Sequence, residues 1–313
     1  MTLALASAML LAGCSKGLED VEGDTLRFTA NVPMLTETKA TPVTEVTDFY
    51  TMGYGATSSQ WFPSEGTAPV NVVLSDGTKS YPDYKWRSGE NHTFYAYSNN
   101  LPSGMTAEIA STGVSLSVTS LPASSSEQTD VLLGVYSGDG SVEETKTGTA
   151  SLHFYHPFAA LQFTVGSIAA LSEITNIEVG GLYSQGSTAL STSNTVTGSG
   201  SQSIAQFAWQ DRGGYLSATQ SCSVKAFTSG TEIGEPFMLI PQTFSGDVTL
   251  DIMVKMKDGM PRHIAGTLST GSLVAGKKTV CAISYDGRDV SLSCTIADWG
   301  TGQSSTMKVE DSE

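Results

Sequence analysis

Short apolar segments recur along this 313-residue chain at intervals of roughly 8–15 residues, and Gly, Ser, Asn, Asp or Pro separate them. No stretch keeps the 3.6-residue period of a helix for more than about two turns. The pattern therefore predicts an all-β protein. The expected strands cover residues 48–55, 70–74, 84–87, 93–98, 114–118, 131–135, 150–155, 160–165, 174–179, 204–209, 222–227, 236–240, 248–256, 262–268, 279–285 and 290–296.

The expected strands fall into two groups of about seven or eight, which is typical of two β-sandwiches in tandem. We expect the first sandwich to cover residues 40–168 and the second to cover residues 169–313. Two runs rich in small polar residues, 124–129 and 191–203, are expected as surface loops because they carry turn-forming side chains and almost nothing to bury.

The segment 25–33 alternates strictly between apolar and polar side chains. Its apolar residues share one face of the expected strand, because successive side chains of a strand point to opposite faces. They are Leu26, Phe28, Ala30 and Val32. Such a strand can fill an apolar groove, although an ordinary first strand would show the same pattern. The Thr-rich loop that follows contains Lys39 before Ala40, a cleavage site for a trypsin-type protease, so residues 25–39 are expected as a groove-filling strand and a cleavable loop.

The start of the chain predicts export and lipid attachment. Residues 2–13 are uncharged and mostly apolar, with the length of a signal-peptide core and too few residues to span a bilayer. They run into Leu11-Ala12-Gly13-Cys14, which resembles the bacterial lipobox. We therefore expect a signal peptide at 1–13, a lipidated Cys14 that anchors the protein in outer-membrane lipid, and an acidic tether at 14–24.

One hairpin can be followed residue by residue. Asp286-Gly287-Arg288-Asp289 has Gly at the first central position of a two-residue loop, as a type II′ turn requires. Counting outward from this turn places Cys281 opposite Cys294 in a non-hydrogen-bonded pair, where Cα atoms lie about 4.5 Å apart. That separation allows a disulfide. Two buried free thiols, which pack like small apolar side chains, are the alternative.

Charge and composition narrow the functional class. The chain has 16 Lys and Arg against 31 Asp and Glu, which gives a formal net charge of −15. This balance excludes nucleic acid as a partner, because its phosphates would be repelled. Only 15% of the residues are charged while 32 are Gly, and this composition is typical of a secreted β protein.

Candidate catalytic and metal-binding groups are sparse. The sequence has no Gly-x-Ser-x-Gly elbow, no phosphate-binding Gly-x-x-x-x-Gly-Lys-Ser/Thr loop and no His-Glu-x-x-His motif. His153 and His156 are three residues apart on an expected strand, so they point to opposite faces and do not form a chelating pair. We therefore predict that the protein is not an enzyme and has neither a cofactor nor a metal site. The four tryptophans either fill the cores or stack on sugars.

Several segments, taken together, resemble the fimbrillin family of Bacteroidetes. After the lipobox, the segments in the first part of the chain are Leu26-Arg27-Phe28-Thr29-Ala30, Thr38-Lys39-Ala40-Thr41, Val46-Thr47-Asp48-Phe49 and Phe94-Tyr95-Ala96-Tyr97. Residues 152–163 are similar to a Phe-x-His-x-x-Ala-x-Leu-x-Phe signature of the family. The last two segments are Leu239-Ile240-Pro241-Gln242-Thr243 and a final hairpin that closes on Trp299. The resemblance implies a type V pilus subunit made of two transthyretin-like β-sandwiches. It would be exported as a lipoprotein to the outer membrane, join other subunits in a cell-surface fimbria and support adhesion to a host glycan or protein.

The resemblance also implies assembly by donor-strand exchange. A trypsin-like protease would cut the loop after the first strand, and a strand from the next subunit would replace the strand that leaves. In the family the cut follows an Arg, whereas the matching position here is Lys39. Either a protease that accepts Lys acts, or the subunit keeps its strand and its lipid as an anchor or accessory protein. After Trp299 only Met307 and Val309 could enter a groove, so the sequence leaves stalk, tip and anchor roles open. The alternative function is that of a non-polymerising surface lipoprotein that binds glycan or host protein.

Overall fold

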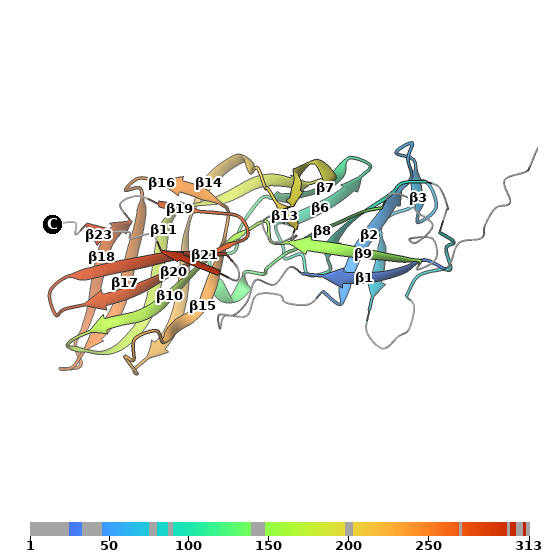
Figure 1. Cartoon of the computed structure of the whole chain (residues 1–313). Coiled ribbons are helices and arrows are strands. Elements are labelled where there is room, and N and C mark those ends of the chain that lie inside the picture. The colour runs from blue at the N-terminus through green and yellow to red at the C-terminus, as the bar shows by residue number, and fades with distance from the viewer. Residues whose placement is uncertain are drawn as a thin grey trace, which may run out of the picture.

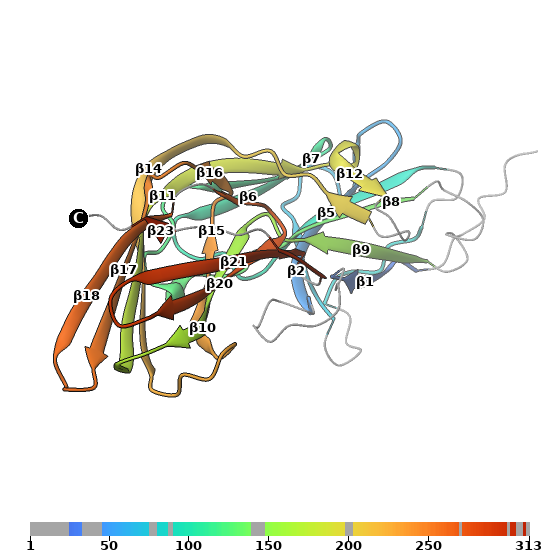
Figure 2. The same ribbon diagram turned by 60° about the vertical axis from the view of Figure 1, so that its left-hand side comes forward.

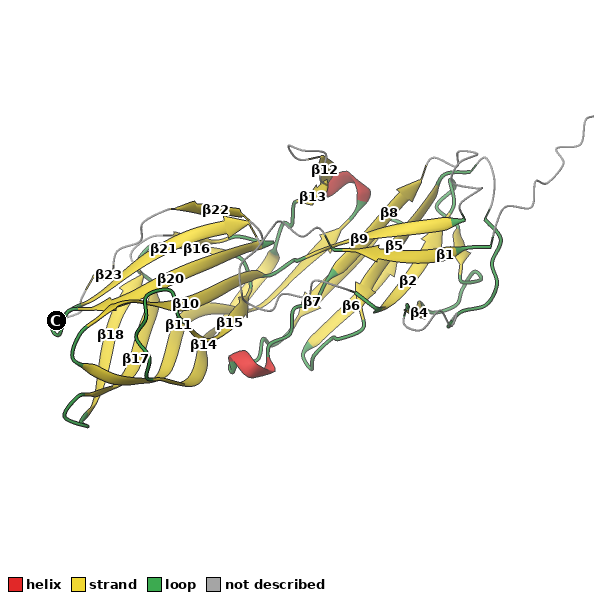
Figure 3. Ribbon diagram, turned by 60° about the horizontal axis from the view of Figure 1, so that its bottom comes forward, coloured by secondary structure: helices red, strands yellow, loops and turns green. Residues whose placement is uncertain are grey.

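The computed structural model describes residues 25–32, 46–74, 80–86, 90–138, 148–197, 203–268, 271–298, 301–304 and 309–310. Within these ranges the chain is built almost entirely from β-strands, and the only helical segments are the 3₁₀ turns η2 (Ser125–Glu127) and η3 (Thr192–Asn194) (Figure 3). No helix in the described part of the chain has the length and apolar character needed to cross a bilayer. The prediction of an all-β fold is confirmed.

A seven-stranded sheet forms the N-terminal end of the elongated molecule (Figure 1). Its first strand in the chain, β1, lies at one edge, and the central strands pair antiparallel as hairpins and meanders do. In spatial order the strands are β1 (Arg27–Asn31), β9 (Thr149–Tyr155), β8 (Leu133–Gly138), β5 (His92–Ser98), β2 (Asp48–Tyr54) and β3 (Gln60–Phe62), with β4 (Val70–Val73) also paired to β2.

Two further sheets, of five and seven strands, form the opposite end of the molecule, and two strands of the seven-stranded one extend beside the N-terminal sheet (Figures 1 and 2). The five-stranded sheet has the order β15 (Glu232–Leu239), β10 (Ala159–Ile168), β20 (Lys277–Tyr285), β21 (Val290–Asp298) and β22 (Thr301–Ser304). The seven-stranded sheet has the order β23 (Val309–Glu310), β18 (Pro261–Leu268), β17 (Val248–Met256), β11 (Leu171–Leu190), β7 (Gly113–Val118) and β6 (Met105–Ala110), and β14 (Gln210–Val224) also pairs with β11. Two small ladders join β12 (Thr195–Thr197) to β13 (Ser203–Ala205), and β16 (Gln242–Phe244) to β19 (Gly271–Leu273).

Strand β11 joins the two ends of the molecule. Its first half pairs with β17 as far as Gly180, and its last residues, from Gly186 to Leu190, pair with β7. The register of β11 shifts after Val179, where Gly181 has a φ of +79°, a conformation that glycine adopts without steric cost. The glycine pair therefore bends the strand instead of ending it, and the strand expected at 174–179 is part of a 20-residue strand. The division between residues 168 and 169 stays a prediction.

The buried apolar side chains form two clusters. The larger one lies between the sheets of the C-terminal half and continues between β7 and the N-terminal sheet, where it includes Tyr95 and Leu133. It contains, for example, Phe163 and Ile283 from the five-stranded sheet and Ile177 and Ile252 from the other. The smaller one lies on one face of the N-terminal sheet and is rich in aromatic rings. Strand β7 follows the period of two of a strand with one buried face, whereas β10 begins with seven consecutive buried residues and is therefore covered on both faces.

Candidate functional site: the edge strand β1 and its groove

Strand β1 is held at the edge of the N-terminal sheet by a parallel ladder to β9, with Phe28 opposite Ala150 and Ala30 opposite Leu152. At its start, the amide of Leu26 donates to the carbonyl of Tyr84 (2.8 Å) and that of Arg27 donates to the carbonyl of Gly148 (2.7 Å). Among the described strands β1 forms a ladder only with β9 and stands at the end of the strand order, so the order of the other described strands does not depend on it.

The apolar face of β1 lies inside the smaller core. Leu26 is fully buried, Phe28 is 6% exposed, Val32 is buried and Ala30 is partly buried. These side chains thus occupy an apolar groove of the sheet, in the alternating manner that a groove-filling strand requires. On the opposite face Arg27 and its polar neighbours are exposed, as the sequence pattern predicts.

Phe28 is the centre of an aromatic cluster. Its ring lies 5.2 Å from the rings of Phe94 and Tyr81, 5.3 Å from that of Phe62 and 6.1 Å from that of Phe49, in each case edge to face. Edge-to-face packing places the positive ring edge against the negative ring face and adds to the free energy gained by burial. With four ring contacts, Phe28 is the aromatic anchor of β1 in this core.

A glycine makes room for one of these rings. Gly53 on β2 lies directly opposite Phe94 on β5, and a Cβ atom at this glycine would lie 2.5 Å from Cε1 of the Phe94 ring. Because glycine has no Cβ, the ring lies flat over the strand and leaves space for Phe28 above it. The same pairing recurs on the neighbouring strands, where Gly134 lies opposite Phe154.

Polar contacts fix β1 along its length. The hydroxyl of Thr29 donates to Oγ of Ser151 across the ladder at 3.0 Å, and the hydroxyl of Tyr81 donates to the carbonyl oxygen of Leu26 at 3.3 Å. Burial raises the pKa of Tyr81, which keeps its hydroxyl protonated and able to donate. Neither tyrosine was singled out from the sequence. Tyr84 begins the strand expected at 84–87, but in the described part of that segment only Lys85 pairs, in an isolated bridge to Thr25.

The remaining processing residues lie outside the described part of the chain. This holds for Cys14 and for Lys39 and Ala40, so the predicted lipid attachment and protease cleavage stay predictions. The predicted cleavage site follows β1 in the sequence, and the described chain resumes at Val46, which packs in the same core as β1.

The hairpin of β20 and β21 places Cys281 directly opposite Cys294, in the register that its turn predicts. The two cysteines form a disulfide with an S–S distance of 2.07 Å and are buried in the larger core. The third described cysteine, Cys222, is free. Burial and the neighbouring carboxylate of Glu173 raise the pKa of the Cys222 thiol to about 11, which keeps it neutral and unreactive.

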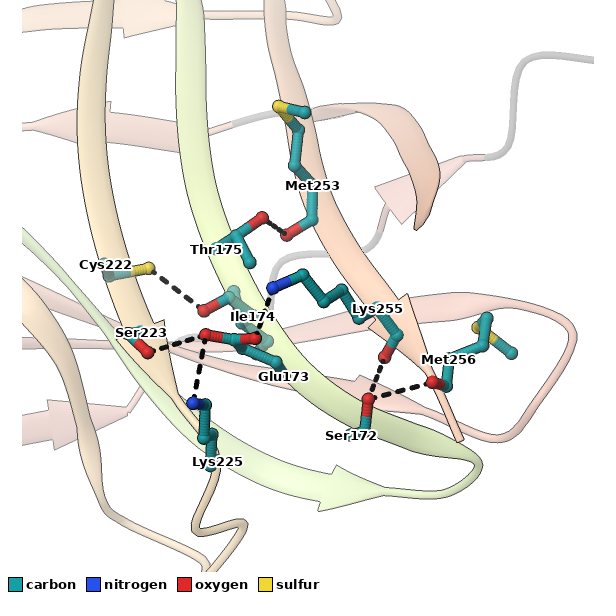
Figure 4. Close-up of polar contacts among 10 residues, drawn as sticks. All are labelled: Ser172, Glu173, Ile174, Thr175, Cys222, Ser223, Lys225, Met253, Lys255 and Met256. Atoms are coloured by element: carbon teal, nitrogen blue, oxygen red, sulfur yellow. Dashed lines mark hydrogen bonds and ion pairs between the residues drawn. The ribbon is translucent and has the colours of Figure 1, made fainter. Parts of the chain in front are cut away.

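A cluster of charged residues joins β11 to both of its neighbours (Figure 4). The carboxylate of Glu173 accepts hydrogen bonds from Nζ of Lys255 on β17 (2.7 Å) and from the hydroxyl of Ser223 on β14 (2.6 Å), and Nζ of Lys225 lies 3.8 Å away. These hydrogen bonds lower the pKa of Glu173, and the one from Lys255 has the largest effect. The arrangement ties three strands together and shows no site for a reacting molecule, so we interpret it as structural.

The histidines and tryptophans also have structural roles where they are described. His156 Nδ1 lies 2.9 Å from a carboxylate oxygen of buried Asp130. Trp61, Trp86 and Trp209 are buried, and Trp299 lies outside the described residues. In the described ranges no three His, Cys, Asp or Glu side chains are grouped so that they could hold a metal ion.

Fold and site together define an all-β sandwich protein whose first strand is a buried edge strand. The sequence matches the model of the fimbrillin-like family over residues 26–299, and the chain belongs to that family. As a member of a fimbrial family, the protein is a pilus subunit of the cell surface. No curated protein matches the sequence.

Two solved structures with a TM-score of 0.50 show a similar fold. A candidate cell adhesion protein from Bacteroides ovatus is 12% identical, with 93% of this chain and 99% of the other covered at a TM-score of 0.50. A second one, from Bacteroides uniformis, is also 12% identical and has a TM-score of 0.50, with 90% of this chain and 99% of the other covered. A fimbrial protein from Bacteroides vulgatus is 14% identical, with coverages of 88% and 99% and a TM-score of 0.47.

Proposed function

We propose that this pilus subunit assembles by donor-strand exchange and that β1 is the strand that is exchanged. The single observation that carries the proposal is the burial of Leu26, Phe28 and Val32, all on one face of an edge strand whose ladder is formed with β9. A first strand with this pattern completes the subunit core before assembly and leaves a groove of matching shape when it is removed.

The energetics favour replacement of β1 over its simple loss. Burial of each large apolar side chain stabilises the folded chain by about 1.5–3 kcal/mol, so a groove without its strand is several kcal/mol less stable. The edge of β9 would also expose unpaired backbone groups, which promote pairing with another chain. An incoming strand with apolar side chains at alternate positions restores the buried apolar contacts and pairs the backbone groups of β9 again. It thereby links one subunit to the next.

Processing supplies the trigger in this proposal. Lipidation of Cys14 holds the precursor at the outer membrane, and a protease that accepts Lys cuts between Lys39 and Ala40. The cut breaks the covalent connection between β1 and the rest of the sheet. Non-covalent contacts alone then hold residues 25–39 in place. The strand can leave when a donor strand arrives.

The amino terminus of the native protein, isolated from the cell surface, tests the proposal. A start at Ala40 together with ladders of subunits in unboiled gels is the expected result. Lys39→Gln should abolish the start at Ala40 and the subunit ladders. Lys257→Gln, which removes an exposed lysine far along the chain, should leave the start and the ladders unchanged. Native protein that retains a lipidated Cys14 and all of β1 would refute exchange of this strand and would identify an anchor or accessory subunit.

A second function, recognition of a host molecule, is favoured by one specific surface. Tyr215 on β14 is 78% exposed and its ring stacks on that of Tyr183 on β11, with centroids 5.9 Å apart. An exposed aromatic ring stacked on a partly buried one, as Tyr215 is on Tyr183, is a feature expected of a glycan-binding surface.

A further inference from the structure

A pocket of about 530 Å³ is lined by residues at and just before the start of β14 and by residues of the ladder of β16 and β19, and one of them, Arg212, contacts the Tyr183 ring of this aromatic pair. We call it the Arg212 pocket. Its lining includes Phe207, Trp209, Arg212, Pro241, Val274 and Lys277. A volume of a few hundred Å³ lined by apolar groups and a few polar ones is typical of a site for a small ligand or a single sugar residue.

The charge of this pocket is opposite to that of the protein. Arg212 and Lys277 line it, and its described lining contains no Asp or Glu, although the chain as a whole carries a formal net charge of −15. Lys277 lies opposite Asp298 in the β20–β21 register, and burial lowers the pKa of its ammonium group. A pocket with two cations in an acidic protein attracts an anion and repels a cation.

Arg212 is held in place before any ligand arrives. Its guanidinium carbon lies 5.4 Å from the centre of the Tyr183 ring, and Nη1 donates to the carbonyl oxygen of Pro241 at 3.0 Å. Within the described residues no carboxylate lies within ion-pair distance of Arg212. Since a guanidinium has five N–H donors, the fixed group can still bind a carboxylate with two parallel hydrogen bonds.

The surroundings of Arg212 favour a sugar over a peptide. The rings of Tyr183 and Tyr215 stack on each other next to the guanidinium. The pocket lining itself supplies the aromatic rings of Phe207 and Trp209 and the neutral polar side chains of Gln206, Thr243 and Ser272. A sugar ring offers an apolar C–H face for an aromatic platform and hydroxyl groups for amide and hydroxyl side chains. A carboxylate on that ring would meet the two cations.

We propose that the Arg212 pocket binds the acidic residue of a glycan, with its carboxylate on Arg212 and its ring against the aromatic side chains. This site deepens the second function and does not depend on strand exchange, because it uses none of the residues of β1 or its groove. The two proposals can therefore fail separately.

Saturation-transfer NMR on the purified full chain tests the site with matched probes. Methyl β-glucuronide and methyl β-glucoside differ only at the C6 group, which is a carboxylate in the first and a neutral hydroxymethyl group in the second. N-acetylneuraminic acid provides a second acidic sugar. We expect transfer to both acidic sugars and at least about tenfold weaker binding of the neutral one. Arg212→Gln should weaken glucuronide binding by about tenfold or more, and Lys257→Gln, an equal change of charge at an exposed site outside the pocket, should leave it unchanged.

Three results would overturn the proposal. The first is no transfer to either acidic sugar, and the second is equal binding of the glucuronide and the glucoside. The third is stronger binding of N-acetylglutamate than of either acidic sugar, which would assign the pocket to an acidic peptide. Lys277→Gln is measured in parallel, so that a failure of Arg212→Gln to fold does not remove the test.

Discussion

The rings of Phe28 and Phe94 meet edge to face, with their centroids 5.2 Å apart and their planes at 85°. One ring belongs to the edge strand β1 and the other to β5 in the middle of the sheet. This contact therefore joins the strand that we propose to be exchanged to the part of the core that remains, and its strength bears on how firmly the precursor holds its first strand.

Phe28→Ala should lower the free energy of unfolding by about 3–5 kcal/mol, because it removes a buried ring and leaves a cavity among four aromatic neighbours. Urea unfolding of the uncleaved chain measures the change. Asn31→Ala, at an exposed position of the same strand, is the matched control and should change stability by less than about 0.5 kcal/mol. Equal effects of the two substitutions would show that β1 does not anchor this core.

Gly53→Ala should destabilise the protein by about 1–3 kcal/mol, because the new methyl group would lie 2.5 Å from the Phe94 ring and push it toward Phe28. The melting temperature and the near-ultraviolet circular dichroism of the aromatic cluster report the change. Gly213→Ala is the control, since a Cβ at Gly213 meets nothing within 4 Å. A stable Gly53→Ala variant with an unchanged aromatic spectrum would contradict the packing described above.

Replacement of both Cys281 and Cys294 by Ala should cost about 3 kcal/mol of stability, because the disulfide closes a loop with a sequence separation of 13 residues and restricts the unfolded chain. Guanidinium unfolding under non-reducing conditions measures this loss. Reduction of the wild-type protein should produce a similar shift. Cys222→Ala removes the partly buried free thiol and should have a much smaller effect.

Glu173 should make stability depend on pH in the acid range. Its pKa in the folded state is held below the ordinary value of 4.5 by hydrogen bonds from Lys255 and then Ser223, so the unfolded chain binds a proton more readily than the folded chain does. This contribution is therefore fully present above pH 4.5 and is lost as the pH falls through the lower, folded-state pKa. Glu173→Gln and Lys255→Gln should each flatten the fall in unfolding free energy between about pH 5 and 3. Wild-type and variant profiles of equal slope would contradict this assignment.

The sequence predicted the strands best where one face is apolar and the other polar. The alternation of Leu26 and Phe28 with polar residues predicted β1 and its buried face, and the turn at Gly287 predicted the register that joins Cys281 to Cys294. Both rest on local rules, namely the period of two in a strand and the geometry of a two-residue turn.

Other features depend on contacts between distant segments. Most of β14 was not predicted, because its residues from Gln210 to Tyr215 are polar, glycine-rich and largely exposed, so that pairing with β11 alone makes them a strand. The Arg212 pocket is assembled from three segments, which contribute Trp209, Pro241 and Val274. No spacing within the sequence marks such a site, since the fold brings these segments together.

The parallel ladder of β1 and β9 runs along the long axis of the molecule (Figure 1). A filament under tension between the cell surface and a host transmits force along its subunits. When such a force acts on one end of a strand that lies along the pulling direction, it loads all five pairs from Arg27 to Asn31 in shear at once, and does not open them one after another. A replacement strand in the position of β1 would inherit this geometry, so each joint of the filament would resist pulling more strongly than peeling.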